Sequence, residues 1–193
     1  TYGVRFHNIK CMGSTGALGS SGIATYGSTN CTSNYCEFTG ASSDQCVYMA
    51  AGSHFYYCSF HDNTVHGVKA QAGTTSLFSH CLFYRNTGSS DGLNVNGSLT
   101  CATFLNCVFA DNGGAGLNFV GSGNQVTVYN CVFYNNTTYG IDGAAVLDSL
   151  WVYNCAFGAN GTAAYDATNV VHVINELTLT GDPFTSRATG DFT

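Results

Sequence analysis

Charged residues are scarce in this chain. Asp, Glu, Lys and Arg make up 8% of its 193 residues, whereas soluble domains usually contain roughly a quarter. Five Lys plus Arg stand against eleven Asp plus Glu, which gives a formal net charge of −6. The sequence therefore lacks the basic surface that neutralises phosphate groups, and we expect no nucleic-acid partner.

Proline and long apolar runs are also nearly absent. The chain has one Pro, and no apolar run approaches the roughly 20 residues of a membrane-spanning helix, so we expect no membrane span. The first residues, TYGVRFHNI, do not resemble a signal peptide. They already alternate like a strand, which favours a mature chain or an excised piece of a longer one. Gly, Phe and Tyr are abundant while Leu and Glu are few, and this balance predicts an all-β fold.

A repeat of about 24 residues runs through most of the sequence and is typical of a solenoid. Its reference position is Cys in six of seven units: Ile9, Cys36, Cys58, Cys81, Cys107, Cys131 and Cys155. Two residues later, six of the seven units have Phe: Phe38, Phe60, Phe83, Phe109, Phe133 and Phe157. Both columns are expected to face one interior.

The unit from Val126 to Gly143 shows how one coil is built. Its apolar residues alternate at Val126 and Val128 and again at Cys131 and Phe133, but the parity changes between the two pairs. A strand cannot change parity without a bend. We therefore expect two short strands joined by a tight corner and a third strand at Gly140-Ile141, which gives three short strands per coil.

Asn recurs at two turn positions of the repeat. Asn8, Asn106, Asn130 and Asn154 precede the reference position, and Asn63, Asn86, Asn112, Asn136 and Asn160 follow it by five residues. Asn tolerates left-handed backbone conformations, and its amide can bond to a neighbouring turn. We expect these residues to form side-chain ladders between coils.

The pattern N-C-x-F-x-x-N-x-x-x-G-[VIL], intact at 106–117 and 130–141, resembles the repeat of right-handed parallel β-helix proteins, the pectin-lyase-like superfamily. The resemblance covers roughly residues 4–175 and implies a solenoid of about seven coils. This family includes polysaccharide lyases and hydrolases, phage tailspikes, adhesins and repeat proteins without known activity. The resemblance therefore indicates the fold and leaves the function open.

Two regions are expected: a parallel β-helix domain at 1–175 and an irregular C-terminal tail at 176–193. The tail contains the single proline, Pro183, and we expect it to cover part of the last coil, because solenoids need capped ends. No amphipathic helix precedes Val4. The first coil is compatible with stacking on another subunit, with homo-oligomerisation or with membership of a larger chain.

The Cys column is expected to consist of thiols that pack as small apolar residues. Stacked coils hold parallel side chains about 4.8 Å apart, which is unfavourable for relaxed disulfide geometry. No C-x-x-C pair and no paired His spacing is present, so we expect no metal site and no cofactor. Cys101 lies off the column and is expected to be partly exposed.

Two sets of charged residues are candidates for catalysis. Asp62, Arg85 and Asp111 occupy equivalent positions in consecutive coils, where an Arg between two carboxylates could serve a polysaccharide lyase. The simpler interpretation is a surface charge ladder. Asp142 and Asp166 continue an outward row that begins at Lys69, Asn94 and Asn118. The expected distance between their carboxyl groups is close to the distance between the two catalytic carboxyl groups of retaining glycosidases. A polar solvated row is the simpler interpretation here.

Aromatic residues at outward positions are the candidates for ligand binding. They are Tyr56, Tyr84, Tyr129, Tyr134, Tyr153 and Trp151. Such side chains could stack on sugar rings or contact a partner protein, or they could simply stabilise neighbouring coils as cross-strand aromatic pairs do.

The sequence thus favours a non-enzymatic structural or adhesive module on a cell, filament or virion surface, with a glycan or another protein subunit as partner. The alternative is a polysaccharide lyase or glycoside hydrolase that uses the charged residues named above. The low number of basic residues and the lack of a dense acidic cluster or cofactor motif favour the first hypothesis.

Overall fold

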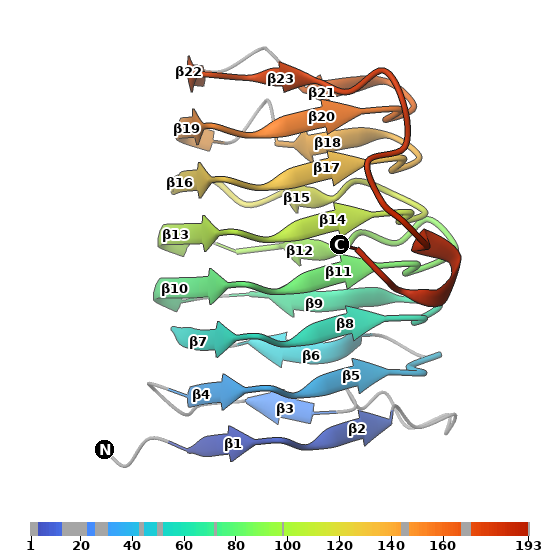
Figure 1. Ribbon diagram of the computed structural model, residues 1–193. Helices are drawn as coiled ribbons and strands as arrows, with labels where there is room; N and C mark the ends of the chain where they lie inside the picture. The colour runs from blue at the N-terminus through green and yellow to red at the C-terminus, as the bar shows by residue number, and fades with distance from the viewer. Residues whose placement is uncertain are drawn as a thin grey trace.

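The computed structural model describes residues 4–12, 23–25, 31–42, 45–49, 52–71, 73–97, 99–143, 147–166 and 171–192. Successive coils stack along one axis and place their strands in three sheets, here called A, B and C (Figure 1). Neighbouring strands within each sheet are parallel. The predicted all-β parallel β-helix is confirmed. Among the described residues, no helix is long and apolar enough to cross a membrane.

Sheet A contains the strand that precedes the reference position of each coil. Its strands, in spatial order, are β1 (Arg5–His7), β4 (Cys31–Asn34), β7 (Ser53–Tyr56), β10 (Gly73–Ser79), β13 (Leu99–Leu105), β16 (Asn124–Tyr129), β19 (Leu147–Tyr153) and β22 (Val171–Ile174).

Sheet B contains the strand that follows the reference position. Its strands are β2 (Lys10–Met12), β5 (Glu37–Thr39), β8 (Ser59–His61), β11 (Leu82–Tyr84), β14 (Val108–Ala110), β17 (Val132–Tyr134), β20 (Ala156–Gly158) and β23 (Leu177–Thr178).

Sheet C contains the third strand of each coil. Its strands are β3 (Ile23–Thr25), β6 (Gln45–Met49), β9 (His66–Ala70), β12 (Leu93–Val95), β15 (Leu117–Phe119), β18 (Tyr139–Asp142) and β21 (Ala163–Tyr165).

The corner between sheets A and B is made by one residue in a left-handed conformation. This residue has a φ between 52° and 57° in every described coil: Asn8, Tyr35, Tyr57, His80, Asn106, Asn130, Asn154 and Asn175. A single left-handed residue reverses the parity of the side chains, so both the residue at the reference position and the Phe two residues later point inward. The parity change in the sequence therefore has the predicted structural cause.

The interior is a column of stacked aromatic rings beside a column of thiols. Phe83, Phe109 and Phe133 stack with ring centroids 4.6 and 4.8 Å apart, and their exposed fractions are zero. The six cysteines of the predicted column are buried thiols. Burial raises the pKa of the Cys81 and Cys107 thiols well above the ordinary value, so they are core residues rather than nucleophiles.

A ladder of buried amides runs beside this core. Each of Asn63, Asn86, Asn112 and Asn136 donates from Nδ2 to the Oδ1 of the next Asn in the ladder at 2.8–2.9 Å, and the ladder ends at Asn160. Most members also donate to a core carbonyl one coil back, as Asn112 does to Phe83 at 3.0 Å. The predicted ladder is confirmed, and it satisfies backbone groups that would otherwise be buried without partners.

The C-terminal segment first extends the solenoid and then turns back along it (Figure 1). Strand β23 pairs with β20, so the repeat continues to Thr178, beyond the boundary expected at 175. From there the chain runs back along the outer face of sheet B, through the 3-10 turn η1 (Arg187–Thr189), to the level of β11 (Figure 1). Strand β23 therefore lies over sheet B of the last coil expected from the sequence, as anticipated for the tail, but the rest of the tail leaves that coil (Figure 1). Its apolar anchors, Phe184 and Phe192, pack on outward tyrosines of earlier coils instead.

Candidate functional site

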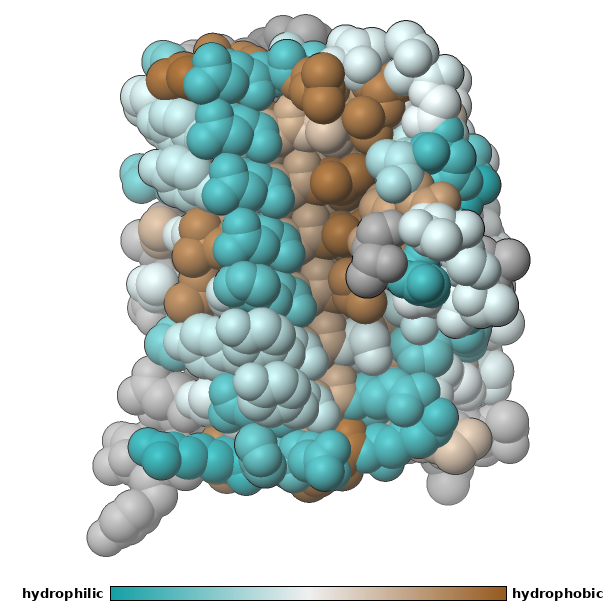
Figure 2. All heavy atoms as spheres, viewed as in Figure 1, coloured by the Kyte–Doolittle hydropathy of each residue, from teal (hydrophilic) through white to brown (hydrophobic). Residues whose placement is uncertain are grey.

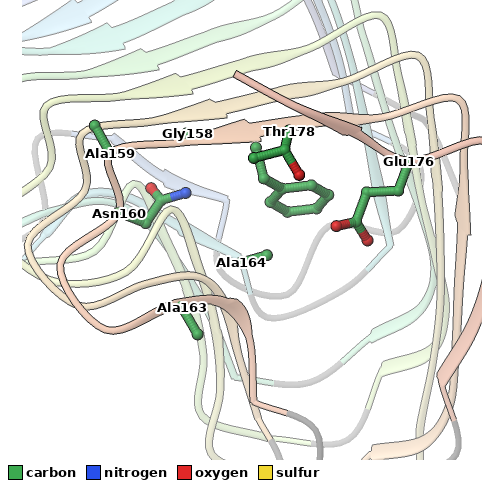
Figure 3. Close-up of a pocket in the computed structure, with 8 residues that line it drawn as sticks. Gly158, Ala159, Asn160, Ala163, Ala164, Glu176 and Thr178 are labelled. Carbon is green, nitrogen blue, oxygen red and sulfur yellow. The ribbon is translucent and has the colours of Figure 1, made fainter. Parts of the chain in front are cut away.

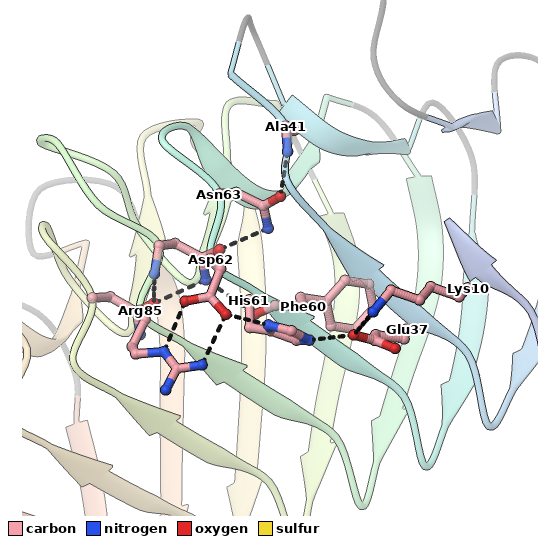
Figure 4. A network of polar contacts seen from close by, with 10 residues as sticks. Lys10, Glu37, Ala41, Phe60, His61, Asp62, Asn63 and Arg85 are labelled. Carbon is pink, nitrogen blue, oxygen red and sulfur yellow. Dashed lines mark hydrogen bonds and ion pairs between the residues drawn. The ribbon is translucent and has the colours of Figure 1, made fainter. Parts of the chain in front are cut away.

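A network of five charged or titratable side chains crosses the outer face of sheet B (Figure 4). Lys10 Nζ lies 2.7 Å from Glu37 Oε1, and the same oxygen lies 3.0 Å from His61 Nε2. His61 Nδ1 lies 2.7 Å from Asp62 Oδ2, and Arg85 donates two hydrogen bonds of 2.8 Å to the Asp62 carboxylate. Two of the predicted catalytic residues, Asp62 and Arg85, are therefore in direct contact.

This bidentate pair opposes the use of Arg85 as a general base. The Asp62 carboxylate raises the pKa of Arg85, so the guanidinium holds its proton more firmly than in solution. Desolvation tends to raise the pKa of Asp62, but its hydrogen bonds to Arg85 and His61 outweigh it and lower that pKa. The arrangement is that of a surface charge network, which was the simpler of the two interpretations.

Asp111 is engaged by other groups. Asn135 Nδ2 donates to Asp111 Oδ1 at 2.6 Å, and Arg187 of the tail approaches the same oxygen at 3.0 Å. Arg187 also lies over the ring of Tyr134, 5.0 Å from its centroid. Asp111 therefore anchors the C-terminal segment to the solenoid.

Two of the six predicted ligand-binding aromatics are covered by this segment. Tyr84 and Tyr134 point outward from sheet B, but they are 7% and 8% exposed. Phe192 packs on Tyr84 with ring centroids 4.7 Å apart, and Phe184 packs on Tyr134 at 6.0 Å. The prediction that these two tyrosines are exposed is wrong, because a segment without repeat periodicity covers them.

The second predicted set of carboxylates lies on the outer face of sheet C. Lys69, Asn94, Asn118 and Asp142 form a row in register across neighbouring strands, and Asp166 follows the residue paired with Ile141. The structure thus brings Asp142 and Asp166 together as predicted. Desolvation, followed by the charges of Asp166 and Asp91, raises the pKa of Asp142.

Asp91 was not identified from the sequence. It is 4% exposed, and its carboxylate accepts hydrogen bonds from Asn94 Nδ2 at 2.9 Å, Asn118 Nδ2 at 3.0 Å and the backbone N–H of Ala115 at 2.8 Å. It lies in the turn before β12, which is two residues longer than most equivalent turns. That extra length was the available signal. Its hydrogen bonds hold the row of amides on sheet C in place.

The raised pKa of Asp142 leads to a pH-dependent prediction. Because the pKa of Asp142 is higher in the folded than in the unfolded state, ionisation of this carboxyl lowers the free energy of unfolding. The whole loss is present above the folded-state pKa, and none of it is present below the ordinary value of 3.8. We expect Asp142→Asn to raise the free energy of unfolding at pH 7 by about 0.5 kcal/mol, the size of a partly solvated charge interaction. The gain should vanish in urea titrations below the ordinary pKa. The exposed Asp148→Asn is the control, and an equal gain for both variants at all pH values would contradict the prediction.

Aromatic side chains gather on the outer face of sheet A near its C-terminal strands. Trp151 and Tyr129 are 37% and 36% exposed, and Tyr153 is half-buried. Tyr129 and Tyr153 stack at 4.5 Å, and Trp151 stacks on His172 at 3.9 Å. The predicted outward orientation of these residues is confirmed. Tyr56, on β7 in the N-terminal half of the same sheet, also points outward and is half-buried.

A second aromatic group lies at the corner between sheets A and B. Tyr35 stacks on Tyr57 at 4.9 Å, and Tyr57 stacks on His80 at 4.7 Å. Sequence reasoning missed this stack because it considered only Asn at the corner position. The available signal was the replacement of Asn by aromatic residues in three consecutive units.

A small pocket lies beside the last coil, lined by Gly158, Ala164, Glu176 and Thr178 among others (Figure 3). Glu176 occupies the reference position that is Cys in the preceding coils, and its carboxylate faces the pocket. None of the residues predicted as functional lines it. In the described part of the chain, no group of three His, Cys, Asp or Glu side chains is arranged to hold a metal ion.

Comparisons with known proteins bear on the fold. No curated protein matches the chain. A crystal structure of a mutant of the periplasmic alginate epimerase AlgG superimposes with a TM-score of 0.64 at 13% identity, covering 91% of this chain and 43% of that one. The chain thus spans less than half the length of that enzyme, and the likeness concerns the fold alone. A family model described as a right-handed β-helix region matches residues 1–157. With this match and the three parallel sheets, the chain belongs to the right-handed β-helix family.

Proposed function

We propose that this chain is a non-enzymatic binding module of an extracellular, cell or virion surface, and that it binds a neutral glycan through the outer face of sheet A. The observation that carries the proposal is the exposed cluster of Trp151, Tyr153, Tyr129 and His172. These side chains stand on a rigid sheet, which suits a binding surface because little conformational entropy is lost on binding.

The geometry of Trp151 supports contact with a sugar ring. One face of the indole is covered by His172, 3.9 Å away. On the other side, the residue paired with Trp151 is Thr127, whose side chain is too small to cover an indole. That face can accept the apolar face of a pyranose ring. The rings of Tyr129 and Tyr153 largely cover each other, and we assign them the role of supporting the cluster.

The charge distribution supports a neutral rather than an acidic glycan. The net charge of the chain is −6, and three of its five basic residues, Lys10, Arg85 and Arg187, form ion pairs with carboxylates. Asp148 lies exposed on the same strand as Trp151. A polyanionic chain would therefore meet repulsion at this face.

We expect Trp151→Ala to weaken binding to a neutral polysaccharide at least tenfold, because the exposed indole face is lost. Affinity electrophoresis in gels that contain hydroxyethyl cellulose, galactomannan or dextran measures this, with alginate and polygalacturonate as acidic comparisons. Leu77→Ala changes an outward residue of the same column in an earlier coil and serves as the matched control. Equal retardation of Trp151→Ala and wild type would contradict the proposed site.

A polysaccharide hydrolase is the second candidate, and the pair Asp142 and Asp166 favours it. Adjacent strands are about 4.8 Å apart, close to the roughly 5–5.5 Å separation of the carboxyl groups in retaining glycosidases, and the raised pKa of Asp142 is suitable for a general acid. If the wild type released reducing ends from any of these polysaccharides and Asp142→Asn did not, the chain would be this hydrolase rather than a non-enzymatic binding module.

A further inference from the structure

The corner between sheets A and B carries aromatic residues where the fold favours Asn. All eight described corner residues have a left-handed backbone, which Asn adopts readily and bulky side chains adopt rarely. Five coils have Asn there, whereas three consecutive coils have Tyr35, Tyr57 and His80. Rare backbone conformations tend to cluster at active sites and ligand-binding sites.

The Asn residues of this column show that the fold does not need the aromatics. Asn130 Nδ2 donates to Asn106 Oδ1 at 3.2 Å, and Asn175 Nδ2 donates to Asn154 Oδ1 at 2.9 Å. This exposed amide ladder joins neighbouring coils without unfavourable backbone geometry. It lies at the edge of sheet B, where Figure 2 shows a hydrophilic column with paler residues in its lower half.

The aromatic corner is the most exposed aromatic surface in the described chain. Tyr35 and Tyr57 are 56% and 49% exposed, the largest fractions among the described tyrosines. Their rings are nearly parallel, with an interplanar angle of 5°, and the ring of His7 lies nearly perpendicular to Tyr35 at the N-terminal end of the stack. Because the faces of the rings cover one another, the outward surface is a row of ring edges and phenol groups.

The corner residues Tyr35, Tyr57 and His80 include no carboxylate, ammonium or guanidinium group. Asn106 Nδ2 lies 3.1 Å from His80 Nε2, and an amide N–H can only donate, so Nε2 accepts and the proton of the neutral ring lies on Nδ1. His80 Nδ1 lies 2.9 Å from Ser79 Oγ, which can accept it. An uncharged, hydroxyl-bearing ligand suits such a surface better than an ionic one.

We infer that Tyr35, Tyr57 and His80 form a second glycan-binding site, which contacts successive sugars of a neutral polysaccharide that lies along the solenoid axis. The inference rests on the proposed function and extends it to a separate surface. The rings repeat at 4.7–4.9 Å, so a polymer can contact several of them at once, whereas a monosaccharide can contact one. The site should therefore bind polymers and discriminate against single sugars.

The double variant Tyr35→Asn/Tyr57→Asn tests this site. Asn is the residue that the same corner uses elsewhere, so the variant should keep the wild-type circular dichroism spectrum and a similar melting temperature. We expect its affinity for the neutral polysaccharide that retards the wild type to fall at least tenfold. Free glucose, mannose or galactose at the same mass concentration should not compete. Asn154→Gly, which changes the same corner in a later coil, should bind like the wild type.

The outcomes separate the two sites. If the double variant is folded and binds the polysaccharide as tightly as the wild type, this inference is wrong, even if Trp151→Ala weakens binding. Loss of binding in the double variant together with wild-type binding by Trp151→Ala supports the corner and overturns the sheet A site. If the wild type binds none of the three neutral polysaccharides, both proposed sites are wrong. If a monosaccharide competes effectively, the proposed contact with successive sugars is wrong.

Discussion

Asn112→Leu should lower the free energy of unfolding by about 3–5 kcal/mol, since each buried group left without a partner costs roughly 1–3 kcal/mol. Asn112 is 1% exposed. Its Oδ1 accepts from Asn86 Nδ2 at 2.9 Å, and its Nδ2 donates to the Phe83 carbonyl at 3.0 Å and to Asn136 Oδ1 at 2.9 Å. Leu has a similar size but cannot form any of these bonds, so partners in two neighbouring coils are affected.

Urea unfolding followed by circular dichroism measures this loss, and Asn130→Gly provides the control. Asn130 belongs to the exposed ladder, and Gly adopts the same left-handed conformation readily, so Asn130→Gly should lower the free energy of unfolding by no more than about 0.5 kcal/mol. We expect Asn112→Leu to be more destabilising than Asn130→Gly, because water can replace a lost hydrogen-bond partner only at the exposed ladder. Similar losses for both variants would show that the buried amides contribute no more than the exposed ones.

The second large effect is expected for Phe109→Ala, which should destabilise the fold by about 3–5 kcal/mol. Phe109 lies between Phe83 and Phe133 in the core stack and contacts Phe104 edge-on at 5.8 Å. Truncation removes the contacts of a completely buried ring with three neighbouring rings. It leaves a cavity in the middle of the solenoid, where coils on both sides hold the backbone in place.

Val108→Ala is the matched control for this variant. Val108 lies on the same strand but points outward, and it is only partly buried. We expect a loss of about 1 kcal/mol, the value for one or two partly buried methyl groups. A loss for Phe109→Ala no greater than that for Val108→Ala, measured from urea midpoints, would mean that the core relaxes to fill the cavity.

The candidate sites could be predicted to different degrees. Trp151, Tyr129 and Tyr153 were placed on an outward face by strand alternation alone, and the structure has them there. Asp142 and Asp166 were brought together by the repeat register. Asp62 and Arg85 were also found in contact, but their bidentate pairing, which opposes a catalytic role for Arg85, depends on side-chain geometry that periodicity does not describe.

The chain's own sequence determined the coil. A repeated Cys and Phe column, a left-handed corner and a Gly-started third strand define the same path in each unit, and each coil contacts mainly its neighbours, so local pattern is enough to specify the stack. Only the tertiary structure decided which outward residues remain accessible. The tail joins Phe192 to Tyr84 across more than one hundred residues of sequence, and such a contact has no period from which it could be predicted. The exposure of Tyr35 and Tyr57 was likewise decided in three dimensions, because it depends on a corner that no other segment covers in the described structure.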